Sequence, residues 1–434
     1  MSLPPRNPHT RINSLGSFIP FAHEDSHGSS SRHGSGSSQR SPPAGRRSSP
    51  SAASLTTQEH GRHFLANSPQ YLFPWDSVEA HSMDLFHKAA TLARGGGRAR
   101  IHSAPLRPNE HLRILDLGTG TGLWVVEMAD LYAGRSEVWG VDLAPFQPHL
   151  IPSNAKFQSL DIESHWLLGT ASWDLIHIRC LNGVVRNWPS LYATVHSHLI
   201  PGVGYIEHVE IDWTPQPALP GGVGSSSIGG GGGSSGSGNT PSSPCLAAWA
   251  SILLNCMDRT GRPLRVDPAE TRLALHEAGF VDVRQDTYQL PFDRRESAGA
   301  SASRASPTSA SPTRTRTSLP SLSSLSSPSS HSLSVFPLSD DDDEGAEDGN
   351  DNDGSHDSSS PSGRHGGGVE KWFPRAFDLW LEGLTLMPLL RAGYDLDTIY
   401  RLMADVRREV ADPSCTASCT MYIWTAKCSV RQER

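Results

Sequence analysis

The sequence has little that would bind it to nucleic acid or hold it in a membrane. Its formal charge is −8, with 37 Lys and Arg against 45 Asp and Glu, so no basic excess favours contact with a nucleic-acid backbone. No apolar stretch approaches the roughly 18 residues that a membrane span requires. The region after Met1 lacks a charged start followed by an apolar core, so no secretory signal is expected. These absences predict a protein that binds neither nucleic acid nor a membrane.

Cysteine pairs with a metal-binding spacing are missing as well. Cys415 and Cys419 stand near each other, but no matching His or Cys pair accompanies them, so we expect no metal site. Free thiols in a reducing compartment inside the cell are the default for such a pattern. The six cysteines are Cys180, Cys245, Cys256, Cys415, Cys419 and Cys428.

Much of the chain is too poor in apolar residues to form a core. Of 434 residues only 36% are apolar, while Gly and Pro number 40 and 33. Residues 1–56 form a tail rich in Ser, Pro and Gly, and two inserts follow at 220–243 and 295–368, the second strongly acidic. Such segments bury too little apolar surface to offset their ordering entropy, so we expect disorder there. The remainder of 57–434 is predicted to be one folded domain, because strands needed for its sheet follow both inserts.

Three alternating glycines follow the most strand-like segment. The apolar run 114–117 ends in Asp116-Leu117 and leads into Gly118, Gly120 and Gly122, after which 123–132 reads as a helix. Glycine allows a sharp turn and a close approach of a ligand to the backbone. The spacing is Gly-x-Gly-x-Gly, which fits neither the dinucleotide fingerprint nor a phosphate loop with its Lys-Ser/Thr. NAD and ATP are therefore poor ligands for this turn.

Two acids follow later strands at informative positions. Asp142 lies 20 residues after Gly122, where a strand, helix, strand unit places a carboxylate that accepts hydrogen bonds from a ribose. Asp161 follows the next strand and would share the same sheet edge, because parallel strands point their carboxyl ends to one side. A solvated loop acid is the alternative for Asp161.

Other segments leave alternatives open. The amphipathic helix expected over 78–94, with Asp76 or Ser77 as its cap, is either a packing helix over the next domain's mouth or a lid that contacts ligand. His177 is a core histidine or a group near the substrate. Glu207, His208 and Glu210 form the polar face of a strand, or one of them lines the pocket.

Seven candidate strands alternate with helices, which predicts an α/β fold with a mostly parallel sheet. The strands are expected at 113–117, 137–143, 156–160, 172–179, 203–213, 281–290 and 420–426. The helices are expected at 78–94, 123–132, 191–199, 245–259, 268–278, 372–390 and 397–410.

Taken together, these motifs resemble the class I S-adenosylmethionine-dependent methyltransferases, which have a Rossmann-like, seven-stranded sheet with helices on both faces. More closely, the chain is similar to the fungal LaeA-type methyltransferases of the velvet complex over roughly residues 71–213. That resemblance implies a last strand antiparallel between the fifth and sixth. The matching stretches are 83–88, Asp116 to Gly122, 140–148, Asp161-Ile162, 173–177, 187–189 and 209–212.

The resemblance also implies S-adenosyl-L-methionine as cofactor. Asp116 and the glycine turn would hold its amino-acid end, Asp142 its ribose hydroxyls and Asp161 its adenine amino group. Methyl transfer needs mainly an aligned nucleophile and a dry site, so no catalytic residue is assigned. The implied cofactor-binding residues are Asp116, Gly118, Thr119, Gly120, Gly122, Asp142, Leu143, Asp161 and Ile162.

By resemblance, the expected function is that of a methyltransferase that regulates secondary-metabolite genes with velvet-domain partners. The expected location is the nucleus, with the cytoplasm as a second compartment, and the methyl acceptor is a protein or a small molecule. Two alternatives stay open: a metabolic O- or N-methyltransferase that acts on a small molecule, and a catalytically silent scaffold of the same fold.

Overall fold

The structure is a computed structural model, and it describes residues 55–96, 100–107, 110–144, 146, 150–217, 243–292 and 368–430. The predicted tail and inserts lie outside these residues, apart from Leu55, Thr56, Ser243 and Gly368. Their predicted disorder stays a prediction.

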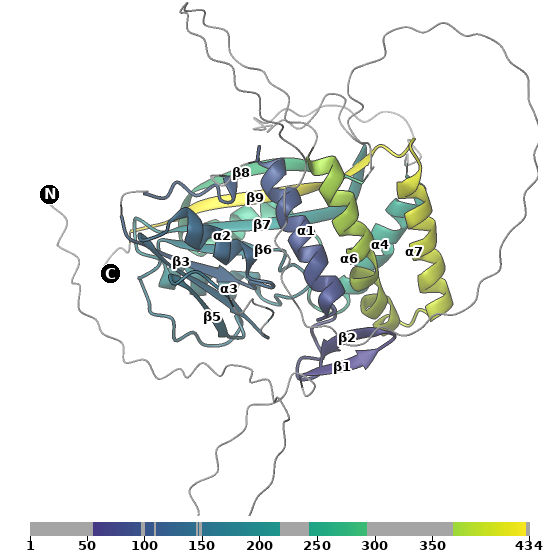
Figure 1. The fold of residues 1–434 in the computed structure, drawn as a ribbon, viewed down its shortest axis with the longest axis horizontal. Helices are drawn as coiled ribbons and strands as arrows, with labels where there is room; N and C mark the ends of the chain where they lie inside the picture. The colour runs from purple at the N-terminus through teal and green to yellow at the C-terminus, as the bar shows by residue number, and fades with distance from the viewer. Residues whose placement is uncertain are drawn as a thin grey trace, which may run out of the picture.

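A seven-stranded sheet forms the centre of the molecule, in the order β5-β4-β3-β6-β7-β9-β8 (Figure 1). The first five strands of this order are parallel, and β9 runs antiparallel to both β7 and β8. The predicted α/β class is confirmed, and so is the place of the last strand between the fifth and the sixth. The strands are β3 (Leu112–Leu117), β4 (Ser136–Asp142), β5 (Ala155–Ser159), β6 (Leu175–Arg179), β7 (Tyr205–Pro217), β8 (Phe280–Pro291) and β9 (Ala417–Cys428).

Helices cover both faces of the sheet, as parallel strands that are buried on both faces require. On one face α2 (Leu123–Leu131) buries Trp124 and Met128 against Ile114 and Leu175. On the other face α3 (Trp188–His198) and α5 (Pro268–Glu277) pack with Leu115 and its neighbours in a second core. The two cores fix the strand ends that carry the functional motifs.

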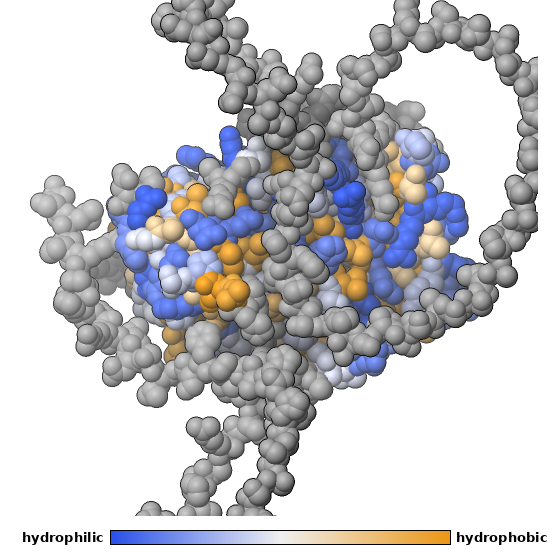
Figure 2. Space-filling view, viewed as in Figure 1, coloured by the Kyte–Doolittle hydropathy of each residue, from blue (hydrophilic) through white to orange (hydrophobic). Residues whose placement is uncertain are grey.

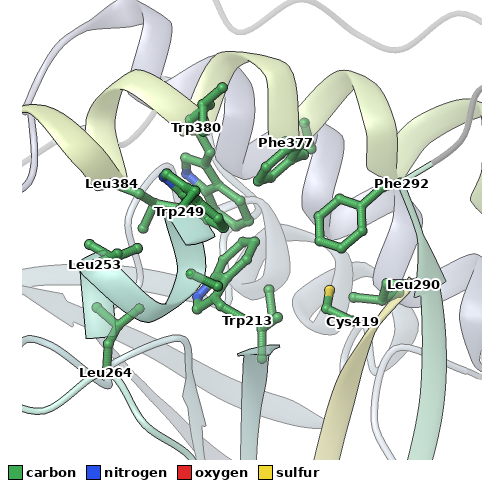
Figure 3. Packing of buried hydrophobic residues seen from close by; sticks show 14 of the residues in the cluster. Trp213, Trp249, Leu253, Leu264, Leu290, Phe292, Phe377, Trp380, Leu384 and Cys419 are labelled. Carbon is green, nitrogen blue, oxygen red and sulfur yellow. The ribbon is translucent and has the colours of Figure 1, made fainter. Parts of the chain in front are cut away.

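A third core packs four helices against the second half of β7, the end of β8 and the first half of β9. Two of these helices, α1 (Ser77–Ala93) and α6 (Val369–Arg391), lie side by side although nearly 300 residues separate them in the chain (Figure 1). The other two are α4 (Pro244–Asp258) and α7 (Leu396–Ala411). Figure 3 shows Trp213 of β7, with Trp249 and Trp380 gathered above it. Hydrophilic side chains gather along the outer edge that α7 forms (Figure 2), so its apolar side faces the core.

A small hairpin that the sequence did not predict precedes α1. Strands β1 (Thr56–Glu59) and β2 (Arg62–Leu65) pair antiparallel around His60 and Gly61, which both have positive φ. A two-residue turn with positive φ at both positions matches the twist of a hairpin. Thr56, assigned to the tail, therefore belongs to the folded domain. No helix in the described ranges is long and apolar enough to cross a membrane.

Candidate functional site

The three glycines form the predicted turn between β3 and α2, with φ of 68° at Gly118, 55° at Gly120 and 80° at Gly122. These values lie in the left-handed region that favours glycine. A Cβ at Gly118 would stand 2.5 Å from Leu181 Cδ2, and one at Gly120 would stand 2.9 Å from Met83 Sδ. The turn therefore needs glycine for its positive φ angles and for the close packing of the Leu181 and Met83 side chains against it.

Asp142 ends β4 and is tied directly to this turn. Its Oδ2 accepts a hydrogen bond from the Gly120 amide at 2.8 Å, and its Oδ1 accepts one from the Leu143 amide at 2.7 Å. Desolvation raises the pKa of Asp142 to about 6, against the effect of these backbone donors. The carboxylate keeps lone pairs for a ligand, because each oxygen can accept more than one hydrogen bond.

A cavity opens at the carboxyl edge of the parallel strands and encloses about 1450 Å³, including the part that is open to solvent. We call one side of it the cofactor end, which is lined by 118–121, 142–143 and 160–163. Seven of the nine predicted residues line this end: Gly118, Thr119, Gly120, Asp142, Leu143, Asp161 and Ile162. Asp161 lines the wall and also closes its own loop, since its Oδ1 accepts from the Glu163 amide at 2.9 Å.

Asp116 and Gly122 are not among the cavity-lining residues. Asp116 is 3% exposed and its Oδ1 lies 2.7 Å from His177 Nδ1, while Gly122 is the N-cap of α2. The His177 ring stacks on Trp124 with ring centroids 4.0 Å apart, and burial lowers the pKa of His177. His177 is therefore a core histidine that orients Asp116 behind the glycine turn.

Helix α1 forms one wall of the cavity. Asp76 caps it by accepting from the Glu79 amide at 3.0 Å, and Thr121 Oγ1 donates to Asp84 Oδ1 at 2.6 Å. Met83 contacts the glycine turn, and Glu79, Met83 and Phe86 line the cavity. The helix is thus a packing helix that also forms a wall of the cavity, and its predicted contact with a ligand stays a prediction.

The opposite side of the cavity, which we call the acceptor end, was not predicted as a unit. Its walls come from the segment before α1, α1 itself, the loop after β6, the end of β7, residues 262–264, and α6. These segments are distant in sequence, and no local motif links them. The only signals were the amphipathic pattern of α1 and the open question over Glu210.

Glu210 resolves that question, since it lines the cavity while Glu207 and His208 do not. Its Oε1 accepts from the amides of Leu181 and Asn182 at 2.8 and 3.0 Å, and lies 3.1 Å from His208 Nε2. Glu210 is 3% exposed, so it holds the loop after β6 against the end of β7 from inside the protein. Leu181 of this loop is the residue that packs on Gly118, so the two ends of the cavity share one loop.

Glu207 does not line the cavity and forms its contacts in the core. Its Oε1 accepts from Arg94 Nη1 at 2.8 Å, and its Oε2 accepts from the amide of Ala104 at 3.0 Å. Arg94 holds the pKa of this fully buried carboxyl below its usual range, against desolvation.

The cofactor end suits a ligand that combines hydrogen-bond donors, a flat apolar ring and a cation. Asp142 can accept from hydroxyls, Asp161 from an amino group, and the side chains of Leu143, Leu160 and Ile162 supply apolar surface around them. Gly118 and Gly120 have no side chain, so their backbone lines the cavity directly. No group of three or more His, Cys, Asp or Glu side chains in the described part of the chain could hold a metal ion.

The chain is similar in sequence to a known protein family. The family described as "Methyltransferase domain" matches residues 60–284. The chain is 38% identical over 226 residues to "Secondary metabolism regulator LAE1" of Cochliobolus heterostrophus, covering 51% of this chain and 66% of that protein. It is 36% identical over 247 residues to "Secondary metabolism regulator laeA" of Fusarium oxysporum f. sp. lycopersici, covering 55% and 71%. Roughly a third of each relative thus lies outside the match.

Similarity to solved structures is weaker. A phosphoethanolamine N-methyltransferase 2 of Haemonchus contortus with S-adenosyl-L-methionine aligns with a TM-score of 0.34 at 11% identity, over 83% of this chain and 62% of that chain. The assignment of this chain to a family therefore rests on the family match and the sequence relatives. The sheet order and the cofactor end agree with it. The chain belongs to the class I S-adenosyl-L-methionine-dependent methyltransferases, and among them to the LaeA type.

Proposed function

We propose that this protein transfers the methyl group of S-adenosyl-L-methionine to an acceptor in the cavity, and that this activity regulates secondary-metabolite genes. Methyl transfer is supported by the hydrogen bond between Asp142 and the glycine turn at the edge of the cavity. The cavity also has a second end, apart from this turn, that can hold an acceptor. The cofactor supplies an electrophilic methyl group on a sulfonium. The second half is supported by the relatives, which are named secondary metabolism regulators.

The residues of the chain have distinct tasks in this proposal. Asp142 accepts from the ribose hydroxyls and Asp161 from the adenine amino group, while Gly118 and Gly120 admit the amino-acid end of the cofactor to the backbone. Arg179 ends β6 and lines the cavity, so it offers a positive charge to a carboxylate. Helix α1 excludes water from the centre of the cavity.

The test of the enzymatic half is calorimetry with S-adenosylhomocysteine, the demethylated form of the cofactor. We expect saturable binding to the full chain and strong loss of binding in Asp142→Ala. Wild-type protein that fails to bind this ligand would contradict the methyltransferase proposal.

We further propose that velvet-domain proteins are partners and that the protein acts in the nucleus. This rests on the LaeA-type family and not on a surface of the described residues. The test is a pull-down from the native cell with a tag at Arg434, together with imaging of the tagged protein. Absence of velvet-domain proteins from the pull-down would contradict the proposed partnership.

A metabolic O- or N-methyltransferase is a second candidate. The acceptor end favours it, because a concave compartment lined by aromatic and aliphatic side chains with a few polar groups suits a small molecule. A methylated product formed by the purified protein from an extract of a biosynthetic pathway would support this candidate.

A further inference from the structure

The acceptor end combines aromatic walls with a buried acid. Tyr71, Phe73, Phe86, Trp213 and Trp380 line it together with Glu79, which is 5% exposed. Figure 3 shows Trp213 and Trp380 converging from β7 and α6. Aromatic faces attract cations and apolar groups alike, so the acid decides which kind of ligand the compartment favours.

Glu79 is incompletely satisfied. Its Oε1 accepts from Trp380 Nε1 at 2.8 Å, whereas its Oε2 has no hydrogen-bond partner among the described residues. Oε2 forms a long ion pair with Arg62 Nη2 at 3.6 Å. A buried acceptor without a partner is costly, and a ligand that donates a hydrogen bond would remove that cost.

The charges around Glu79 are also unbalanced. Arg62 lies 2.7 Å from Asp76 and 3.5 Å from Glu382, so a single guanidinium faces three carboxyl groups. The shortest of these contacts goes to Asp76, which leaves Glu79 the weaker share of the positive charge. A cationic ligand would therefore be favoured at this point of the wall.

The other charged groups of the cavity already have partners. Glu210 accepts from two backbone amides, and Arg262 Nη1 lies 2.8 Å from Glu163 Oε2, beside the cofactor end. Arg179 Nη1 lies 3.0 Å from His87 Nδ1. Among the charged side chains that line the cavity, Glu79 is thus the one with a fully buried oxygen that lacks a hydrogen-bond partner among the described residues.

We propose that Glu79 and the aromatic walls around it bind the amino group of the methyl acceptor, carried on an apolar body. This deepens the proposed function and rests on it. A primary or secondary ammonium donates to the Glu79 carboxylate, and its charge is attracted to the aromatic faces. A hydroxyl would meet only the first of these demands.

The titration of Glu79 adds a signature for this site. Burial raises the pKa of Glu79 to about 8, although Arg62 and the Trp380 indole oppose the shift and Asp76 reinforces it. Glu382 faces the same guanidinium, and Tyr71, whose pKa is raised by burial, faces Glu79 as well. At pH 7 the ligand-free carboxyl therefore holds a proton. A bound ammonium stabilises the carboxylate, so binding releases a proton below pH 8 and ceases to do so above about pH 9.

The experiment is calorimetry of the full chain with 2-phenylethylamine and with 2-phenylethanol, which is a neutral molecule of matched size. Titrations at pH 7 in two buffers of different ionisation enthalpy measure the protons released. We expect the amine to bind at least tenfold more tightly than the alcohol and to release close to one proton. Equal affinities, or no binding of the amine at millimolar concentrations, would overturn the proposal.

Two matched variants assign the effect to Glu79. Glu79→Gln keeps an acceptor for Trp380 and should lose both the preference for the amine and the proton release. Glu382→Gln contacts the same Arg62 but does not line the cavity, so it should keep both. Unchanged amine preference in Glu79→Gln would rule out this site.

S-adenosylhomocysteine is titrated separately into each protein. Glu79→Gln should bind it as the wild type does, because Glu79 belongs to the acceptor end. Failure of the wild type in this titration counts against the methyltransferase function itself, whereas failure with the amine alone counts only against the acceptor site.

Discussion

The two ends of the cavity are built in different ways. The cofactor end comes from short segments that directly follow parallel strands, such as 118–121 after β3 and 142–143 after β4. The acceptor end depends on contacts between distant segments, and the bond from Trp380 to Glu79 joins residues 301 positions apart. The first end is therefore fixed by strand geometry, whereas the second depends on how the helices α1 and α6 pack. Variants at the two ends should separate cofactor binding from acceptor binding.

Asp142→Ala should have the largest effect on the cofactor end. It removes the acceptor proposed for the ribose and frees the Gly120 and Leu143 amides. Loss of charge-assisted hydrogen bonds costs roughly 3 kcal/mol, or about 100-fold in the dissociation constant of S-adenosylhomocysteine. Calorimetry measures this loss, and amine binding at the acceptor end should change little.

The wild type offers a control for the charge of Asp142. Its pKa is raised to about 6, and a ligand that donates to the carboxylate favours the ionised form. Affinity for S-adenosylhomocysteine should therefore rise as the pH increases from 5 to 7 and then level off. A flat profile over this range would show that ionised Asp142 does not contact the ligand.

Glu210→Ala tests the loop that both ends share. The change leaves the Leu181 and Asn182 amides without their acceptor, which costs about 2 to 3 kcal/mol of unfolding free energy. Because Leu181 packs on Gly118, binding at both ends should weaken together. Chemical denaturation and the two calorimetric titrations measure these effects. Glu210→Gln keeps an acceptor oxygen and should recover most of the stability, and equal losses in both variants would contradict the role of these hydrogen bonds.

The contrast between the two ends explains what the sequence could predict. The turn from Gly118 to Gly122 and the acid at Asp142 follow local rules of strand, turn and spacing, so seven predicted residues line the cofactor end. Asp116 belongs to the same sequence motif, but it lies within β3 and contacts His177 in the core. The role of Glu79 could not be predicted, because it depends on Arg62 and Trp380, which only tertiary packing brings together.

Glu79→Gln should stabilise the ligand-free protein in a pH-dependent way. The pKa of Glu79 is raised from the ordinary value of 4.5 to about 8, so the folded state holds a proton that the unfolded state has lost. Wild-type stability therefore falls as the pH rises from about 4.5 to 8, and Gln removes this loss. The difference in unfolding free energy between variant and wild type should grow by on the order of 2 kcal/mol between pH 5 and pH 8. Denaturation at both pH values measures it, with Glu382→Gln as the control, and a constant difference would contradict the raised pKa.

Gly120→Ala and Gly134→Ala form a matched pair that isolates close packing from backbone strain. Both glycines have positive φ, 55° and 73°, so an alanine strains either backbone by about 1 kcal/mol. A Cβ at Gly134 meets no atom within 4 Å, whereas one at Gly120 would stand 2.9 Å from Met83 Sδ. Gly134→Ala should lose only the strain energy and keep full affinity for S-adenosylhomocysteine. Gly120→Ala should lose a further several tenths of a kcal/mol as Met83 shifts, and should weaken cofactor binding. If Met83→Ala in the Gly120→Ala background restores stability without restoring affinity, the missing affinity belongs to the turn itself and not to the displaced side chain of Met83.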